Sequence, residues 1–255
     1  MQRLTHSLTR VLAASSFLKT AAASSTSNIP ILNSNQQPRF SSSSSSPPTK
    51  MSSSSATDTF LDLVKSRRTY YALNKTLPIS SDRIRDIITQ ATLHVPSSFN
   101  SQSNRVLVLL GDDHTKFWSL TSSILQAIVP ADKWESTAQR MQMFSAGAGT
   151  ILFFEDRAVI EGMQAKFAIY ADRFPGWATQ SAAMLQFVLW TALEAEGLGA
   201  NLQHYNPLVD AKVAETWGVP ETWRLNAQLV FGGRAGEPGE KAFGPIEEKV
   251  KFFGF

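Results

Sequence analysis

The sequence predicts an α+β fold, a three-layer sandwich in which helices cover both faces of a central mixed sheet. Short runs of aliphatic and β-branched residues at 105–110, 150–154 and 225–231 predict strands. Longer segments between them carry apolar residues every three or four positions, which is the spacing of one helix face. Helices therefore outnumber strands and separate them, and this pattern favours layers of helix on both sides of the sheet.

The first two helices are marked by their N-caps. We expect a short helix over 59–64, with Thr59 as N-cap and Asp62 completing a capping box. Ser80 or Ser81 caps the second helix, whose apolar residues share one buried face. Those apolar residues are Ile84, Ile87, Ile88 and Ala91.

The middle of the chain alternates strands and helices. Pro96 ends the second helix, and a loop rich in Ser and Asn leads to the strand at 105–110. Because the residues of this strand after Arg105 are all aliphatic, we expect it to be buried on both faces. Helices are predicted at about 114–128 and 134–144, and Gly147 to Gly149 lead into the strand at 150–154.

The longest predicted helix covers 177–196 and ends at Gly197 as its C-cap. This helix is apolar nearly all round, so it must be buried on every side, and in a domain this small we expect a second subunit to cover part of it. The last strand, 225–231, ends at Gly232-Gly233. The tail 236–255 finishes with three phenylalanines, and we expect it to pack on the partner subunit.

Residues 1–57 have the composition of an organelle presequence followed by a disordered leader. They hold five of the 24 basic residues, 17 serines and no acidic residue. The first 20 residues can form a basic amphipathic helix, which favours import into the mitochondrial matrix. The alternative is a merely disordered N-terminus, because such composition buries too little apolar area to fold. Met51 offers a second start that would give a cytosolic form.

The remainder, 58–255, is one domain whose composition excludes several classes of protein. Without the leader it carries 19 basic and 21 acidic residues, so the basic pI is no sign of nucleic-acid binding. The absence of Cys excludes disulfides and thiolate chemistry, and the four His have no metal-binding spacing. The apolar stretches are too short for stable membrane insertion.

Two polar segments carry the candidate chemistry. Arg67, Arg68 and Thr69 end the first helix and offer fixed cations and a hydroxyl for a phosphate. The loop 97–102 offers hydroxyl and amide groups that could match a polar heterocycle. The alternatives are a solvated basic pair at a helix end and a turn whose side chains satisfy their own backbone.

Together these segments resemble the nitroreductase superfamily. Ser66-Arg67-Arg68-Thr69, the segment 96–102 and Glu196-Gly197-Leu198-Gly199 occur in its order and spacing. The segments 199–207 and 239–245 look most like the branch of bacterial copper-induced nitroreductases and fungal homologues of the fatty-acid response. The resemblance covers essentially the whole domain.

This resemblance implies an intertwined homodimer with FMN in the subunit interface. Hydride would pass from NADH or NADPH through FMN to a nitroaromatic, quinone or similar electrophile by ping-pong exchange, as in defence against oxidative stress. The residues matching cofactor-binding positions are Arg67, Arg68, Thr69, Ser97, Ser98, Asn100, Gln102, Gly199, Gln203, His204 and Lys241. Those matching the substrate side are Ser98, Phe99, Tyr205 and Asn206.

His204 is the candidate for proton transfer, although flavin chemistry requires no protein acid and a lone His is more often structural. The sequence departs from the wider family at Tyr71 and Phe243, where basic residues are usual, so Arg234 or Arg140 could substitute. No Gly-x-Gly-x-x-Gly is present for a tightly held dinucleotide. The alternative function is a low-turnover binding protein that senses flavin or lipid in a stress or fatty-acid response.

Overall fold

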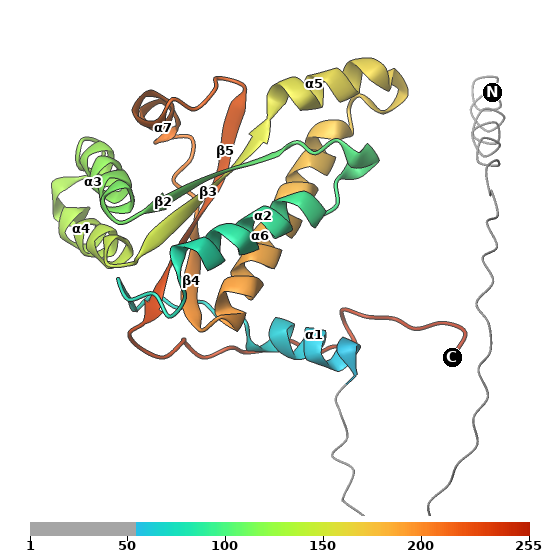
Figure 1. Ribbon diagram of the computed structural model, residues 1–255, viewed down its shortest axis with the longest axis horizontal. Coiled ribbons are helices and arrows are strands. Elements are labelled where there is room, and N and C mark those ends of the chain that lie inside the picture. Colours follow the sequence, from blue (N-terminus) through green and yellow to red (C-terminus); the bar gives the residue numbers. More distant parts are fainter. Residues whose placement is uncertain (1–54) are drawn as a thin grey trace, which may run out of the picture. The chain divides into compact units, whose positions relative to one another are not determined.

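The computed structural model describes residues 55–255, which lie within one compact unit, Ser52–Phe255. The start at Met51 and residues 1–54 of the predicted presequence and leader lie outside the described residues. Residues 55–57, which we assigned to the leader, form the N-cap and the first residues of a helix. A five-stranded sheet is covered by helices on both faces, so the α+β sandwich is confirmed (Figure 1). In chain order the elements are α1 (Ala56–Ser66), β1 (Leu73–Asn74), α2 (Ser81–His94), η2 (Ser98–Asn100), β2 (Asn104–Leu110), α3 (Asp112–Gln126), α4 (Ala131–Ser145), β3 (Gly149–Asp156), α5 (Arg157–Lys166), η3 (Ala168–Tyr170), α6 (Phe174–Ala195), β4 (Leu198–Gln203), α7 (Asp210–Trp217) and β5 (Trp223–Arg234).

The sheet is built around β5 and β3. β3 pairs with β5 on one side and with β2 on the other, while β4 and the short β1 also pair with β5. Every one of these pairs is antiparallel. We expected a mixed sheet, but within residues 55–255 parallel pairing is limited to the isolated bridge between Thr69 and Ala200.

Alternation along the strands divides the core into two halves. Ile151 and Phe153 of β3 face α2 and α6, whereas Leu152 and Phe154 face α3, α4 and α7. The apolar face that the sequence predicts for α2 lies in the half of the core next to α6 (Figure 1). This face consists of Ile84, Ile87, Ile88 and Ala91. Both faces of the sheet are thus buried under helices.

Several element boundaries differ from the sequence-based expectation. The N-cap of α1 is Ser55, which forms a capping box with Asp58, so α1 begins before Thr59. The N-cap of α2 is Ser80, one of the two serines that the sequence offers for this position. β2 is not buried on both faces, because it forms an edge of the sheet and most of its residues are half-exposed.

β5 does not end at Gly232-Gly233 but continues through both glycines to Arg234. The reason is the close approach of β1: a Cβ on Gly232 would lie 2.4 Å from the carbonyl oxygen of Asn74. The strands β1 and β4 and the helices α5 and α7 were not predicted. β4 follows α6 directly after Gly197, whose φ of +88° turns the chain.

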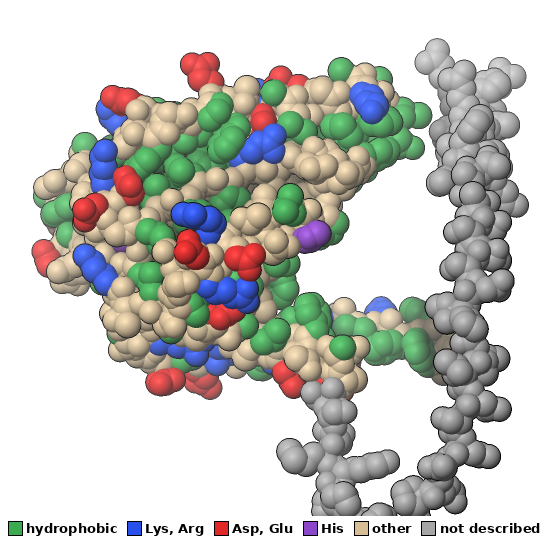
Figure 2. Space-filling model, viewed as in Figure 1, with side chains coloured by type: hydrophobic (Ala, Val, Ile, Leu, Met, Phe, Trp, Pro, Cys, Tyr) green, Lys and Arg blue, Asp and Glu red, His purple; other side chains and the backbone are tan. Residues whose placement is uncertain are grey.

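α6 is the longest helix of the described residues, with 22 residues, and one side of it is uncovered. Met184, Phe187 and Val188 are 40, 37 and 37% exposed, which is unusual for apolar residues in a central helix. The tail after β5 also exposes apolar side chains, and green atoms line α1 and this tail (Figure 2). These tail residues are Phe243, Ile246, Val250, Phe252, Phe253 and Phe255.

Between residues 55 and 255, no helix is long and apolar enough to cross a membrane. The same part of the chain holds no group of three or more potential metal-ligating side chains.

Candidate functional site

Arg67, Arg68 and Thr69 lie where the chain leaves α1 and runs beside β4. Thr69 bridges Ala200, and the Tyr70 N–H donates to the Ala200 carbonyl at 2.9 Å. The Arg67 guanidinium lies over the ring of Trp190, 4.4 Å from its centroid, and forms no ion pair within the described residues. This cation–π contact fixes the guanidinium yet leaves its N–H donors free for an anion.

Glu194 anchors this segment from α6. Its carboxylate accepts the backbone N–H of Arg68 at 2.8 and 3.1 Å and the indole N–H of Trp190 at 2.9 Å. Arg234 lies 3.9 Å away and also donates to the backbone carbonyls of Leu198 and Glu194, both at 3.1 Å. Burial raises the pKa of Glu194, while these donors and cations oppose that shift.

The other basic candidates are placed differently. The Arg68 guanidinium donates to the backbone carbonyl of Gly239 in the tail. Lys241 is exposed, with its ammonium 5.2 Å from the Phe243 ring centroid. Arg234 is engaged with backbone carbonyls and with the Tyr70 ring, which makes it a structural cation. Arg67 is therefore the cation best placed to receive a phosphate.

The segment after β4 is held by amide side chains. Gln203 donates to Asn201 at 2.9 Å, and Gln228 accepts the Tyr205 N–H at 2.7 Å while donating to Asn206 at 3.3 Å. His204 is exposed between these anchored neighbours. The segment from Gln203 to Asn206 is thus fixed at the backbone, with one imidazole presented to solvent.

Tyr205 lies against the core rather than in the open. Its ring packs 5.6 Å from Trp118 and 6.3 Å from Phe144. Burial raises the pKa of the Tyr205 phenol, and the charge of Arg140 on α4 acts in the opposite direction. Gly199 is also closely packed, because a Cβ there would lie 2.9 Å from both Leu73 and Tyr70 side chains.

The loop from Ser97 to Gln102 has a strained backbone. Phe99, Asn100 and Gln102 have φ values of 55°, 50° and 51°, a region that residues other than glycine rarely adopt. The Ser97 hydroxyl accepts the Gln102 N–H at 2.9 Å and closes the turn. Strain of this kind persists where the surroundings impose it.

The Phe99 side chain of this loop is held in a cluster of aromatic rings. The Phe99 ring lies between 4.8 and 5.9 Å from four other rings, measured between centroids. They belong to Phe167, Tyr170, Phe174 and Trp177. The Phe99 side chain is nevertheless 51% exposed, so one of its surfaces remains available to a ligand.

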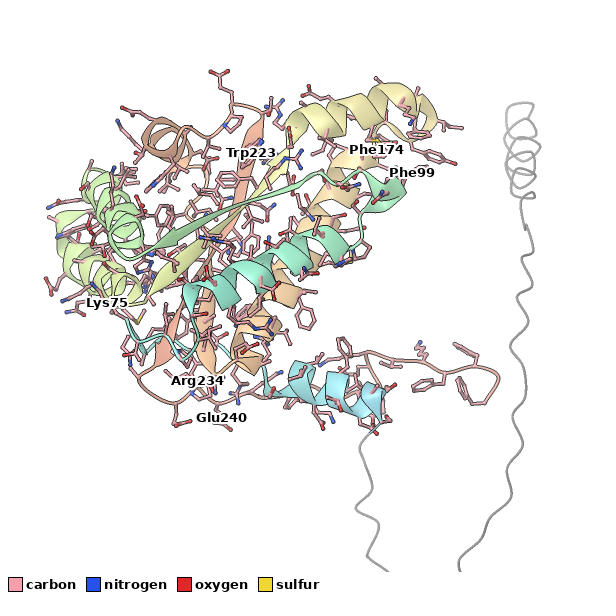
Figure 3. The ribbon with its side chains drawn as sticks, in the orientation of Figure 1. Lys75, Phe99, Phe174, Trp223, Arg234 and Glu240 are labelled. Atoms are coloured by element: carbon pink, nitrogen blue, oxygen red, sulfur yellow. The ribbon has the colours of Figure 1, made fainter. Side chains whose placement is uncertain are left out.

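The two groups of candidate residues lie at opposite ends of α6. Phe99 contacts Trp177 near the start of the helix, and Arg68 contacts Glu194 near its end. These helix positions are about 25 Å apart at the usual rise per residue. Figure 3 shows Phe99 beside Phe174 at one end of the domain, and Arg234 and Glu240 at the other. Within one chain, the segment from Arg67 to Thr69 therefore lies next to the segment that begins at Gly199. The loop from Ser97 to Gln102 lies far from both.

The side chains at the two ends of α6 fit parts of a nucleotide-like cofactor. The end near Glu194 offers the free Arg67 guanidinium for a phosphate. The end near Trp177 offers small polar groups beside the exposed Phe99 ring. Sequence reasoning missed the residues that hold the first group, namely Glu194, Trp190, Asn201 and Gln228. The signal for Glu194 was present, since a carboxylate in an otherwise apolar helix requires partners.

Known proteins resemble this chain in sequence and fold. Nitroreductase FRM2 of Saccharomyces cerevisiae is 34% identical over 191 residues, covering 74% of this chain and 95% of the yeast protein. Nitroreductase CinD from Lactococcus lactis is 40% identical with a TM-score of 0.70, covering 76% of this chain and 99% of CinD. CinD structures contain chloramphenicol or 4-nitrophenol. The fold is also shared, at 17% identity and a TM-score of 0.57, by an Exiguobacterium sibiricum protein that contains FMN.

The fold and site thus define a flavin-dependent oxidoreductase. The chain belongs to the nitroreductase family, whose model matches residues 64–233. The resemblance inferred from the sequence motifs is confirmed by this match and by the yeast and lactococcal relatives.

Proposed function

We propose that this chain is an FMN-dependent oxidoreductase, active as a homodimer, that uses NADH or NADPH to reduce nitroaromatics, quinones or similar electrophiles. The observation that carries the proposal is the placement of the two groups of site residues at opposite ends of α6. A second copy related by a two-fold axis perpendicular to this helix would bring the loop of one chain to Arg67 of the other. Each subunit pair would then have two complete sites.

The uncovered side of α6 supports this assembly. An apolar stripe on α6 is formed by Met184, Phe187 and Val188. In a single chain α1 has no buried residue, and its Phe60 and Leu61 side chains are also exposed. Exposed apolar surface of this extent is typical of subunit interfaces. The exposed tail phenylalanines would be covered in the same contact.

Within such a site, Arg67 binds the cofactor phosphate. Its guanidinium is oriented by the Trp190 ring and stays charged at all relevant pH values. Glu194 holds the backbone of Arg68, which lies between Arg67 and Thr69 in the chain. Lys241 adds a second cation when the tail, which Arg68 contacts at Gly239, is docked.

The segment from Gln203 to Asn206 supports the ring system of the cofactor. When bound, FMN would supply the hydride exchange between nicotinamide and acceptor. Gln228 fixes the backbone at Tyr205, so that the neighbouring N–H groups and the His204 imidazole keep a constant position. Gln203 and His204 orient ligands here, and no proton transfer by the protein is required.

The loop from the second chain completes the acceptor pocket. Ser97, Ser98, Asn100 and Gln102 offer polar groups to the cofactor edge, while the exposed Phe99 ring stacks on a flat acceptor. The chloramphenicol and 4-nitrophenol bound by CinD are aromatic nitro compounds, which supports this acceptor class.

The proposal is tested with the absorbance spectrum of the purified full-length chain. A flavin spectrum that bleaches with anaerobic NADH or NADPH and recovers with 4-nitrophenol or a quinone is the expected result. A flavin that resists bleaching would favour the alternative, a low-turnover flavin- or lipid-sensing protein. A folded, colourless protein that takes up no added FMN would show that the cofactor assignment is wrong.

We also propose mitochondrial import, on the acid-free and serine-rich composition of residues 1–57. N-terminal sequencing of the native protein tests both this proposal and the cytosolic form. Chains that begin near residue 40 indicate import and cleavage, and chains that begin at Met51 or Ser52 indicate the second start.

A further inference from the structure

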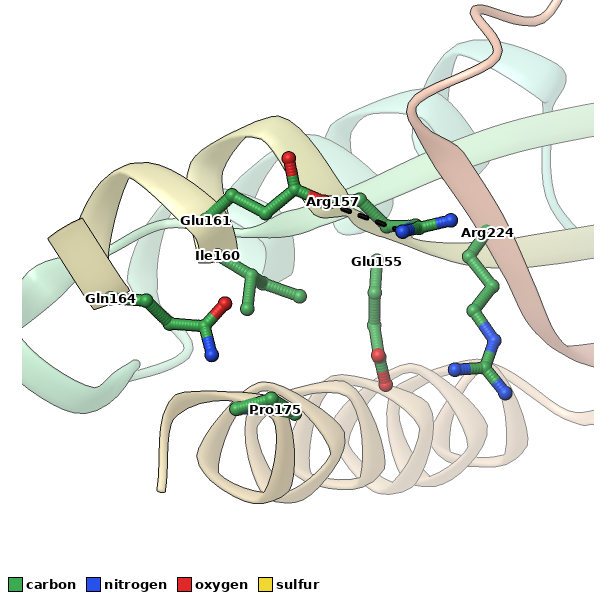
Figure 4. A pocket seen from close by; sticks show the side chains of 7 residues that line it. All are labelled: Glu155, Arg157, Ile160, Glu161, Gln164, Pro175 and Arg224. Atoms are coloured by element: carbon green, nitrogen blue, oxygen red, sulfur yellow. Dashed lines mark hydrogen bonds and ion pairs between the residues drawn. The ribbon is translucent and has the colours of Figure 1, made fainter. Parts of the chain in front are cut away.

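A cavity of about 360 Å³ lies between α5 and α6 at the end of the sheet (Figure 4). One of its lining residues, Ile160, also packs against Phe174, which contacts Phe99. β3 and β5 form one wall, α5 forms the second, and the beginning of α6 forms the third. Its lining residues are Glu155, Arg157, Ile160, Glu161, Gln164, Pro175 and Arg224. None of them belongs to the proposed cofactor site or to the apolar stripe of α6.

Two opposite charges face this cavity from neighbouring strands. Glu155 of β3 and Arg224 of β5 are direct cross-strand partners, so their side chains leave the same face of the sheet. Figure 4 shows both side chains reaching toward α6. Within residues 55–255 neither forms an ion pair, although the charge of Arg224 also reaches Asp210.

The carboxylate of Glu155 is buried and held in place. Glu155 is 6% exposed, and its Oε1 accepts the Asn226 amide at 2.8 Å. The Asn226 amide oxygen in turn accepts an N–H of the Gln186 amide at 2.8 Å, so Gln186 of α6 fixes the amide that donates to the carboxylate. The second oxygen, Oε2, has no hydrogen-bond donor among the described residues. Because Oε2 is not sealed from solvent, a cationic group in the cavity can approach it.

The other charged residues of the cavity are already paired. Arg157 and Glu161 form an ion pair at 3.3 Å along α5. Gln164 donates to the Ala171 carbonyl at 2.7 Å. With Ile160 and Pro175, Gln164 makes a mostly neutral wall opposite the two strands (Figure 4). The cavity thus has one end with two unpaired opposite charges and one uncharged end.

We propose that this cavity is a binding site for a small zwitterion of the α-amino-acid class with a short, uncharged side chain. The ligand ammonium would approach Glu155 Oε2, and its carboxylate would receive the forked donors of Arg224. Ile160, Pro175 and Gln164 would contact the side chain. The cavity volume lies within the range of small-molecule sites. The proposal does not depend on the flavin assignment.

The test is calorimetric titration of the full-length protein with L-alanine and L-valine at pH 7. Propionate and isobutylamine, which each carry one of the two charges, serve as half-ligands. We expect millimolar or tighter binding of the amino acids, and binding at least tenfold weaker for either half-ligand. Isobutylamine binding as tightly as L-valine would overturn the role of Arg224, and no binding of either amino acid would overturn the site.

Matched variants locate the binding. Glu155→Gln and Arg224→Gln should each weaken amino-acid binding at least tenfold. Glu161→Gln makes the same chemical change in the same cavity, at a carboxylate that is already paired, and should change binding less than threefold. Equal losses in Glu161→Gln and Glu155→Gln would overturn the proposal. Because Arg224 is exposed, Arg224→Gln remains informative if Glu155→Gln fails to fold.

The flavin spectrum separates this proposal from the proposed function. Glu155→Gln and Arg224→Gln should retain the flavin content and NADH bleaching of the wild-type protein. Amino-acid binding by a colourless protein would support the cavity while contradicting the cofactor. Normal flavin chemistry without amino-acid binding would do the reverse.

Discussion

Both carboxylate oxygens of Glu194 accept the backbone N–H of Arg68, at 2.8 and 3.1 Å, across 126 positions of sequence. This contact joins the end of α6 to the segment that carries Arg67 and Thr69. Together with the contacts of Thr69 and Tyr70 to Ala200 of β4, it keeps this short, irregular stretch in a fixed position. Glu194 therefore positions the candidate phosphate site without facing the ligand.

Replacing Glu194 by Leu should destabilise the protein by about 3 kcal/mol, because the buried N–H groups of Arg68 and Trp190 would lose their acceptor. The flavin content after purification should fall at least tenfold. The control is Glu196→Leu, two residues away, where an exposed ion pair with Arg83 is lost and the expected change is under about 1 kcal/mol. Chemical denaturation and the flavin spectrum measure the two effects, and equal stability of both variants would contradict the role of Glu194.

Phe187→Glu should prevent the proposed dimer. The new carboxylate would be buried without a partner in the α6 contact, which costs enough to weaken association about 100-fold or more. Sedimentation velocity should then show a monomer without flavin. Ile128→Glu, at an exposed apolar residue after α3, should leave the dimer intact. A Phe187→Glu dimer that retains flavin would show that α6 is not the contact.

Phe99→Ala should raise KM for flat aromatic acceptors about fivefold, because one ring contact of this kind contributes about 1 kcal/mol. Flavin content should not change. Reduction of ferricyanide, which offers no ring to stack, should proceed at the wild-type rate. A parallel loss with ferricyanide would indicate damage to the cofactor instead of the acceptor pocket.

His114 should make the domain sensitive to acid. The residue is buried beside Thr150, and burial lowers the pKa of His114 to about 4 from an ordinary value of 6.5. Because the unfolded chain binds this proton more tightly, the contribution of His114 is complete above about pH 6.5 and is lost as the pH falls toward 4. The loss amounts to about 3 kcal/mol.

Denaturant titrations at pH 7.5 and 4.5 measure this loss. The drop should be about 2.5 kcal/mol smaller in His114→Gln than in the wild-type protein, because pH 4.5 lies above the folded pKa. His94→Gln, at an exposed histidine, should leave the drop unchanged. The same drop in all three proteins would assign the acid sensitivity to carboxylates.

Two glycine substitutions should have opposite effects. A Cβ on Gly232 would lie 2.4 Å from the Asn74 carbonyl and 2.9 Å from the Ala148 nitrogen, so Gly232→Ala should cost about 3 kcal/mol. Gly162 lies within α5 with no neighbour within 4 Å, so Gly162→Ala should stabilise by about 1 kcal/mol. Thermal melts of the two variants compare them directly, and a stable Gly232→Ala would show that β1 can move.

The sequence predicted those elements whose pattern is periodic. The buried face of α2 follows from four apolar residues at helical spacing, and β3 follows from its aliphatic run. β4 was missed because Leu198–Gln203 mixes small, amide and aliphatic residues and becomes a strand by pairing with β5. Pairing with β1 and β4 likewise extends β5 through Gly232 and Gly233, which in the sequence alone indicate a turn.

The site was predicted as segments but not as an arrangement. Arg67 and the loop from Ser97 could be named from their chemistry and motif. Their separation along α6 could not, because sequence spacing does not say at which end of a distant helix a loop packs. The anchoring by Glu194 also depends on a contact between residues far apart in the chain.

The two groups of site residues lie at opposite ends of α6, and this has a genetic consequence if each complete site combines one group from each of two chains. A lesion in the loop of one chain and a lesion at Arg67 of its partner would fall in the same site. The other site of that pair would then be built only from intact halves. Two alleles that are each inactive as homodimers would complement one another when mixed, and each mixed pair would retain one working site.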